Sequence, residues 1–175
     1  MKFTTQFNEL ADREGFIVVS PTQRMFRSPL NCWNSADPRE QHRNAGDPAL
    51  LAGVARQVIE CFDADPSQVH VSGASSGAGT AVILAATYPD LFASATSVAG
   101  GEYSLNQVGI DRPHPEPPEY TARQAWGEMG GRARHGPLLV VQGDADTVVP
   151  PGLRHPARCQ LDRGQRSRRR RAAER

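Results

Sequence analysis

The chain has 175 residues, of which 38% are hydrophobic and 22% charged, and these values exclude a collagen-like or wholly disordered protein. The length suits one domain with a sizeable core, and no apolar run approaches the ~20 residues of a membrane span. The net charge of +1 hides two opposite parts: residues 152–175 are net +7 and the remainder is net −6. We therefore expect one domain over residues 1–150 and a basic, disordered tail over residues 151–175.

The three cysteines are Cys32, Cys61 and Cys159. Their spacing does not match a zinc site, and an odd number does not suggest a closed set of disulfides. We therefore expect no metal ion and no other cofactor. The sequence begins Met-Lys-Phe-Thr-Thr-Gln, without the apolar segment of a signal peptide.

Helical and strand patterns alternate along the first half of the chain. Phe3–Glu14 has helical apolar spacing and ends at Gly15, and the short apolar run Phe16–Val19 predicts a buried strand. After a polar, irregular stretch, Asp47 and Pro48 are predicted to open a helix as its N-cap and first residue. The apolar stripe of this helix comprises Leu50, Leu51, Val54, Val58, Ile59 and Phe62.

The second half continues the alternation. Further strands are predicted at Val69–Val71, Phe92–Ala99 and Leu138–Val141. A glycine-serine turn, Gly73–Gly79, and a helix of small residues, Thr80–Thr87, follow the first of these. The proline-rich, polar segment 100–136 is predicted to be an excursion from this alternation. Strands too apolar for a half-exposed sheet, alternating with helices, indicate an α/β protein with a parallel sheet, whose chemistry lies at the carboxyl ends of its strands.

The strongest motif is Gly73-Ala74-Ser75-Ser76-Gly77, which matches G-x-S-x-G between a predicted strand and a predicted helix. A tight turn in this setting lifts a serine clear of the sheet, and the following helix aims its N–H groups and positive dipole end at developing negative charge. Ser75 is therefore the candidate nucleophile, and the N–H of Ser76 is the candidate oxyanion donor. Ser72 and Ser76 are competing nucleophiles, and a purely structural glycine turn is the alternative interpretation.

A second motif is the aspartate-rich turn that follows the strand Leu138–Val141. Asp146 is the candidate acid of a catalytic triad, because an acid at the carboxyl end of a strand can orient a histidine. Asp144 is the fallback, and a structural turn is the alternative for both. The order serine, aspartate, histidine of an α/β-hydrolase makes His155 the candidate base. The segment Thr147–Arg154 is too short to hold the helix and strand that normally precede such a histidine.

Several stretches together resemble the esterase / polyhydroxybutyrate depolymerase family of α/β-hydrolases. They are Asn31-Cys32-Trp33-Asn34, Gly46-Asp47-Pro48, Val69–Gly79, Ala86–Ala93 and the acid loop Gly143–Val149. The resemblance runs from about Phe7 to Pro150. It implies a secreted, extracellular serine esterase with Ser75 as nucleophile and Asp146 as acid. It also implies substrates of the polyhydroxyalkanoate, feruloyl or acetyl-polysaccharide ester type.

The chain departs from that family pattern in three places. Ala74 stands where the family usually has a bulkier residue. Family members have a strand and a His-Gly-Cys turn before the helix at Phe3–Glu14, and the cysteine of that turn is the implied partner of Cys32. They also have a strand with a histidine loop after the acid loop. We therefore expect an α/β-hydrolase-like, mostly parallel sheet with flanking helices that lacks the N-terminal strands and the C-terminal histidine-bearing strand.

Two other functions remain open at this point. One is a different α/β-hydrolase, such as a lipase or peptidase. The other is a non-catalytic module that binds partners through the arginine run Arg166–Arg171, which can contact phosphate backbones without sequence specificity. We expect an ester substrate as the partner, with no specific nucleic acid and no membrane span. The oligomeric state is left open.

Overall fold

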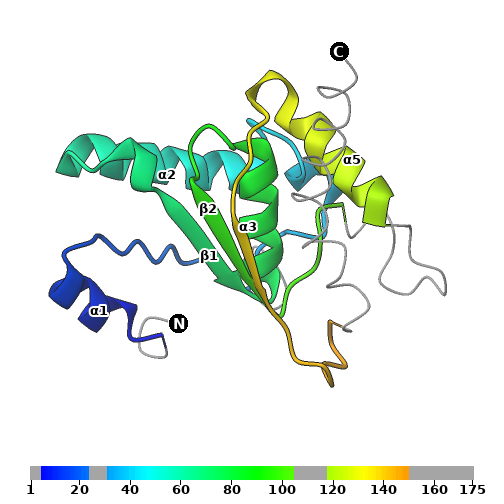
Figure 1. Ribbon diagram of the computed structural model, residues 1–175, viewed down its shortest axis with the longest axis horizontal. Helices are drawn as coiled ribbons and strands as arrows, with labels where there is room; N and C mark the ends of the chain where they lie inside the picture. Colours follow the sequence, from blue (N-terminus) through cyan, green and yellow to red (C-terminus); the bar gives the residue numbers. More distant parts are fainter. Residues whose placement is uncertain (1–4, 24–30, 105–117, 150–175) are drawn as a thin grey trace, which may run out of the picture. The chain divides into compact units, whose positions relative to one another are not determined.

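A computed structural model describes residues 5–23, 31–104 and 118–149. The chain divides into two compact units, Met1–Asn31 and Cys32–Arg175. In the first unit, helix α1 (Phe7–Glu14) is followed by a segment without regular structure (Figure 1). The helix ends as its sequence predicts: Gly15 adopts a left-handed conformation with φ 74°, and its N–H donates to the carbonyl of Ala11 at 2.8 Å.

The predicted buried strand at Phe16–Val19 is wrong. The segment has no strand structure, and the side chains of Phe16, Ile17 and Val19 are 42%, 49% and 46% exposed. A strand is held by hydrogen bonds to a neighbouring strand, and a short apolar run does not by itself specify such a neighbour. Within the described residues the sheet contains no strand from this segment.

The second unit contains a sheet of three parallel strands in the order β1-β2-β3. They are β1 (His70–Ala74), β2 (Ser94–Val98) and β3 (Leu138–Val141). Val71 pairs with Ala95, and Ala95 pairs with Leu138, so these three residues share one face of the sheet. The predicted α/β class with a parallel sheet and flanking helices is confirmed.

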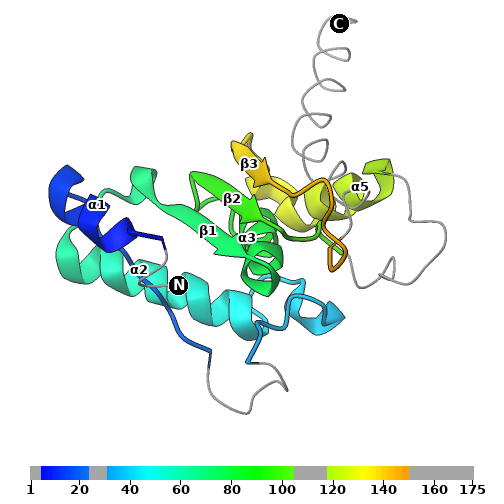
Figure 2. The same ribbon diagram turned by 90° about the horizontal axis from the view of Figure 1, so that it is seen from below.

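Helix α3 (Ser76–Thr87) lies against β1 and β2, and it packs against α2 (Gly46–Phe62) and α5 (Pro118–Met129) (Figures 1 and 2). The helix is apolar on every side, as expected of a helix that is buried all round. One cluster of buried residues contains Ala52, Leu84, Tyr88, Leu91 and Phe92, and a second contains Val82, Ile83, Ala86, Tyr103 and Ala125. The predicted small-residue helix therefore forms the centre of the core.

Helix α2 differs from its prediction at its first turn and along its stripe. Its N-cap is Ala45, which provides no side-chain cap, so the predicted capping role of Asp47 is wrong. The buried Asp47 carboxylate instead accepts hydrogen bonds from the backbone N–H and side-chain amide of Asn34, both at 3.2 Å. Leu50 and Phe62 belong to the predicted apolar stripe but are 58% and 67% exposed.

Helix α5 lies inside the segment 100–136, which was predicted to be an excursion and in which no helix was predicted. Thr121, Ala125 and Met129 are buried and recur every four residues, which is the spacing of one helix face. This spacing is difficult to recognise in the sequence, because the surrounding segment is rich in proline and polar residues. Short 3₁₀ turns occur at Pro38–Glu40, Pro66–Gln68 and Gly130–Arg132. Within the described ranges, none of the helices combines the length and apolar character needed to cross a bilayer.

The loop before α2 is fastened to the end of α3 by Arg43. Its guanidinium donates to both carboxylate oxygens of Asp90, at 2.5 and 2.8 Å, and to the carbonyl of Thr87 at 2.9 Å. It also lies 4.5 Å from the centre of the Tyr88 ring, within range of a cation–π interaction. These contacts hold the loop that carries Trp33 and Asn34 in a defined position on the second unit.

Candidate active site

Ser75 lies at the junction between β1 and α3, as the motif predicts. Its backbone has φ 54° and ψ −123°, a conformation that non-glycine residues rarely adopt. The Ser75 N–H donates to the Val98 carbonyl at 2.9 Å, and its own carbonyl accepts from the N–H groups of Ala78 and Gly79 at 2.9 and 3.1 Å. The strained residue is thus held from both sides, while its side chain is exposed. Such strain is characteristic of functional sites.

The turn is tight enough to require glycine at its first motif position. A Cβ atom on Gly73 would lie 2.1 Å from the carbonyl oxygen of Gly77 and 2.7 Å from the backbone nitrogen of Ala78. These contacts are to backbone, which cannot rotate away as a flexible side chain can. A Cβ on Gly77 would instead meet Trp33 at an ordinary 3.7 Å. Gly73 therefore sets how closely the strand approaches the helix.

The variant Gly73→Ala is expected to lose about 3 kcal/mol or more of unfolding free energy, because the strand and helix must separate to admit the methyl group. Gly53→Ala is the matched control, since no described atom lies within 4 Å of the corresponding Cβ on the exposed side of α2. That change should add about 0.5–1 kcal/mol by reducing backbone entropy in the unfolded chain. Urea titrations measure both, and equal effects at the two positions would contradict the close approach.

Ser76, the candidate oxyanion donor, is the first residue of α3. Its N–H therefore has no intrahelical carbonyl to which it can donate, and it lies at the positive end of the helix dipole. Ser35 and Trp33 border this first part of the helix: a Cβ on Gly79 would approach the Ser35 side chain to 2.9 Å. The Cys-Trp-Asn element thus lies beside the turn that carries Ser75. Cys32 is partly buried and forms no disulfide within the described residues.

Asp146 lies in the turn after β3 and has well-defined partners. One carboxylate oxygen accepts from the N–H groups of Val148 and Val149, both at 2.9 Å, and the other accepts from the Gln142 amide at 2.8 Å. The two backbone donors, with a smaller effect from Gln142, lower the pKa of Asp146 from its usual 3.8. The carboxylate is therefore kept ionised and oriented, as a triad acid must be. The fallback, Asp144, is exposed.

Ser75 and Asp146 lie at the same edge of the sheet. Each follows the carboxyl end of a parallel strand, with β2 between them. The pairing continues past the strand ends, since Ser75 donates to Val98, and Ala99 donates to the Val141 carbonyl at 2.8 Å. Two strand spacings amount to ~10 Å. This spacing refers to the backbones of β1 and β3, and a triad requires a histidine between the serine and the acid.

The histidines of the described residues have other positions. His42 pairs with Glu128 at 3.0 Å, and His70 contacts the Ser94 hydroxyl at 2.8 Å from the first residue of β1, at the opposite end of the strand from Ser75. His70 is therefore a hydrogen-bonded residue of the sheet. His135 is exposed before β3. The candidate base, His155, lies outside the described residues.

The sequence analysis missed Glu102, which follows β2 at the same edge. The side chain is 3% exposed, and its Oε2 accepts from the Thr121 hydroxyl at 2.9 Å. Burial raises the pKa of Glu102 to about 7, although the Thr121 hydrogen bond works in the opposite direction. The burial of Glu102 could not be predicted from the local residues, because a glutamate in a polar, proline-rich segment is normally solvated.

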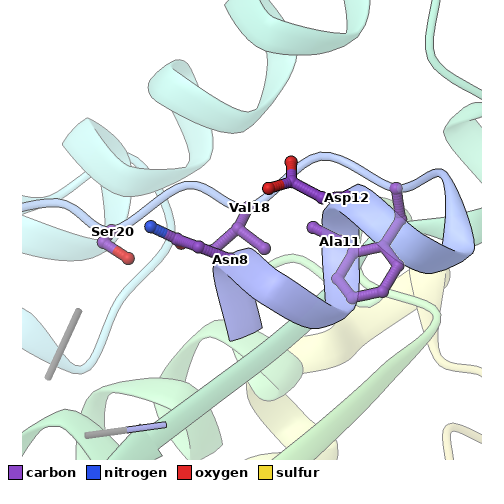
Figure 3. A pocket seen from close by; sticks show the side chains of 6 residues that line it. Asn8, Ala11, Asp12, Val18 and Ser20 are labelled. Atoms are coloured by element: carbon purple, nitrogen blue, oxygen red, sulfur yellow. The ribbon is translucent and has the colours of Figure 1, made fainter. Parts of the chain in front are cut away.

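Metal-type clusters and a hollow in the first unit are the other features to compare with this site. The described residues contain no group of three or more histidine, cysteine or acidic side chains that could hold a metal ion. The hollow lies between α1 and the segment that follows it (Figure 3). Its lining residues are Asn8, Ala11, Asp12, Phe16, Val18 and Ser20, which include no histidine and no cysteine.

Comparison with known proteins shows the family of this chain. The model of the family described as esterase PHB depolymerase matches residues 1–110. The chain belongs to this family. The resemblance to the esterase PHB depolymerase family noted in the sequence is therefore confirmed.

Individual relatives of this esterase family are similar over most of the chain. Poly(3-hydroxyalkanoate) depolymerase C of Paucimonas lemoignei is 28% identical over 161 residues, 83% of this chain and 37% of that protein. Acetylxylan esterase A of Aspergillus awamori is 38% identical over 160 residues, 81% of this chain and 50% of that protein. Feruloyl esterase B of Neurospora crassa is 29% identical, over 84% of this chain and 54% of that protein.

A solved structure is also similar to this chain. The acetyl xylan esterase from Aspergillus awamori superimposes with a TM-score of 0.75 at 28% identity, covering 89% of this chain and 60% of that one. The α/β-hydrolase-like fold is therefore confirmed. The chain spans about a quarter to a half of the length of the curated relatives it matches.

Proposed function

We propose that residues 1–150 carry the core of a serine esterase that hydrolyses carboxylic esters through an acyl-enzyme on Ser75. The observation that carries the proposal is the backbone of Ser75, held at φ 54° and ψ −123° between a strand and a helix. Family membership supports the same reaction class, because the relatives are named as esterases and a depolymerase. Of the tail at 151–175, this proposal uses only His155, the candidate base.

The proposed reaction follows from the placement of these groups. The Ser75 oxygen attacks the ester carbonyl carbon, and the tetrahedral oxyanion accepts the Ser76 N–H at the start of α3. The proton of Ser75 passes to the base, for which His155 is the candidate, and then to the departing alcohol. Water releases the acid from the acyl-enzyme by the same steps. Asp146 orients the base and stabilises its cationic form.

The proposed substrates are esters of the polyhydroxyalkanoate, feruloyl or acetyl-polysaccharide type, as named for the relatives. We also propose an extracellular location, as the resemblance to the secreted esterases of this family implies. A lipase or peptidase is distinguished by substrate: hydrolysis of acetylated xylan, methyl ferulate or polyhydroxybutyrate supports the proposal. Cleavage confined to long-chain acyl esters or to peptides would overturn it.

A fluorophosphonate probe tests the nucleophile directly. The probe should label the folded chain once, and mass spectrometry should locate the label on Ser75. Heat-unfolded protein is the control, because labelling by a specific site requires the folded turn. Label on Ser72 or Ser76, or equal labelling of folded and unfolded protein, would contradict the assignment.

A further inference from the structure

The segment that follows β2 supports the turn that carries Ser75. Ala99 has a left-handed backbone with φ 51°, and its N–H donates to the Val141 carbonyl at 2.8 Å. A Cβ on the next residue, Gly100, would lie 2.3 Å from the Cβ of Ala78. Ala78 in turn donates its N–H to the Ser75 carbonyl at 2.9 Å. The backbone at Gly100 therefore rests directly against the first turn of α3, which includes the candidate oxyanion donor.

Two contacts fasten the far end of this segment to the loop before α2. The Tyr103 hydroxyl donates to the carbonyl of Gln41, and the N–H of Ser104 donates to the Gln41 side-chain oxygen at 3.2 Å. All of these residues are buried. The segment 99–104 is thus fixed at both ends, and Glu102 lies between the fixed points.

Glu102 joins the middle of the segment to α5. Its Oε2 accepts from Thr121 at 2.9 Å, while its Oε1 is buried without a hydrogen-bond partner among the described residues. No described cation pairs with this carboxyl. A buried carboxyl without a counter-charge is far more favourable in its neutral form than in its ionised form.

The charged and titratable groups on the neighbouring elements have other partners. On α5, Glu128 accepts from His42 and from the backbone N–H of Arg43. The Arg43 guanidinium pairs with Asp90. The Tyr103 hydroxyl is committed to Gln41, and burial raises its pKa, with a smaller effect from Glu128. None of these contacts neutralises Glu102.

We propose that Glu102 is a positioning residue for the nucleophile turn, and that its ionisation weakens the support which segment 99–104 gives to Ala78 and Ser75. This inference rests on the proposed esterase function. In the neutral form, Glu102 keeps the segment against α5 and holds Gly100 against α3. In the ionised form, the carboxylate needs water that the closed packing excludes, so the segment must open.

The sign of the pH effect follows from the direction of the shift. The pKa of Glu102 is raised from 4.5 to about 7 in the folded chain, so the folded state binds the proton more tightly than the unfolded state. The contribution of Glu102 to stability is therefore greatest below pH 4.5 and is lost as the pH rises through about 7. The competence of Ser75 should decline above pH 7 as the ionised fraction grows.

The test is the rate of fluorophosphonate labelling of Ser75 in the full chain between pH 5.5 and 9. The wild-type rate should fall about tenfold or more above pH 7, since two pH units above a pKa leave about 1% of the neutral form. Glu102→Gln should remove this fall, because the amide stays neutral and its oxygen still accepts from Thr121. Glu60→Gln, on the exposed side of α2, is the matched control and should retain the fall.

A second variant separates this role from simple packing. Thr121→Val removes the hydrogen bond that lowers the pKa of Glu102. The fall in the labelling rate of Ser75 should therefore occur at a higher pH than in the wild type. The proposal would be overturned if the labelling rate of Glu102→Gln fell above pH 7 as in the wild type, or if the wild-type rate did not fall. If Ser75 is not labelled at any pH, the esterase function fails instead. The Glu102 inference is then decided by whether Glu102→Gln removes the loss of urea stability between pH 5 and 8.

Discussion

Replacing Ser75 with glycine is expected to abolish ester hydrolysis while making the folded chain more stable. The φ of 54° and ψ of −123° cost a non-glycine residue about 1–3 kcal/mol, and glycine removes that strain. Glycine also increases the conformational entropy of the unfolded chain, which lowers the free energy of unfolding by about 0.5–1 kcal/mol. The net gain should be about 1 kcal/mol in urea titration. Turnover should fall about 10⁶-fold, as for loss of a catalytic serine.

Two matched variants separate the oxygen from the backbone. Ser75→Ala removes the hydroxyl but retains the Cβ, so it should lose turnover without the gain in stability. Ser72→Ala, on the regular strand β1, should retain turnover. A loss of stability in Ser75→Gly would show that the turn is not strained, and residual turnover near the wild-type level would place the nucleophile at another serine.

The features that the sequence predicts well are those that local chemistry determines. The turn at Ser75 is one, because Gly73, the small residues after it and the flanking apolar runs all specify the same strand–turn–helix geometry. The parallel sheet is another, since its strands alternate with helices along the chain. The capping glycine at Gly15 is a third. The turn and the capping glycine need only a short stretch of sequence, and the class of the sheet follows from the order of strands and helices along the chain.

The features that the sequence predicts poorly depend on distant partners. Phe16–Val19 has the composition of a buried strand, yet a strand needs a neighbour that its own residues do not specify. Asp47 has the character of a helix cap, but it binds Asn34, which lies across the loop. Glu102 is buried because α5 covers it, and α5 itself was missed. Such errors concentrate where tertiary contacts override local preference.

Replacing Asp146 with asparagine is expected to reduce turnover about 10⁴-fold, as for a triad aspartate replaced by its amide. The loop should keep most of its geometry. The asparagine oxygen can accept the N–H groups of Val148 and Val149. The Gln142 side-chain oxygen, which has no partner among the described residues, can accept from the new amide if the Gln142 amide turns over, with loss of its hydrogen bond to the Val149 carbonyl. The loss should therefore appear in kcat, with KM nearly unchanged.

The control for this variant is Asp144→Asn, two residues away on the same turn and exposed, which should retain wild-type turnover.

Acid titration gives an independent measurement. Because the folded pKa of Asp146 lies below its usual 3.8, the wild type gains stability from the carboxylate above that pH and loses it as the pH falls through the folded value, whereas Asp146→Asn should not. Equal losses of turnover in the two variants would assign Asp146 to loop structure alone. A loss confined to Asp144→Asn would move the acid to that residue. The proposal predicts that turnover is lost only in Asp146→Asn and that this variant no longer loses stability in acid. That result would show that turnover depends on the charge of the Asp146 carboxylate, which its hydrogen bonds keep ionised.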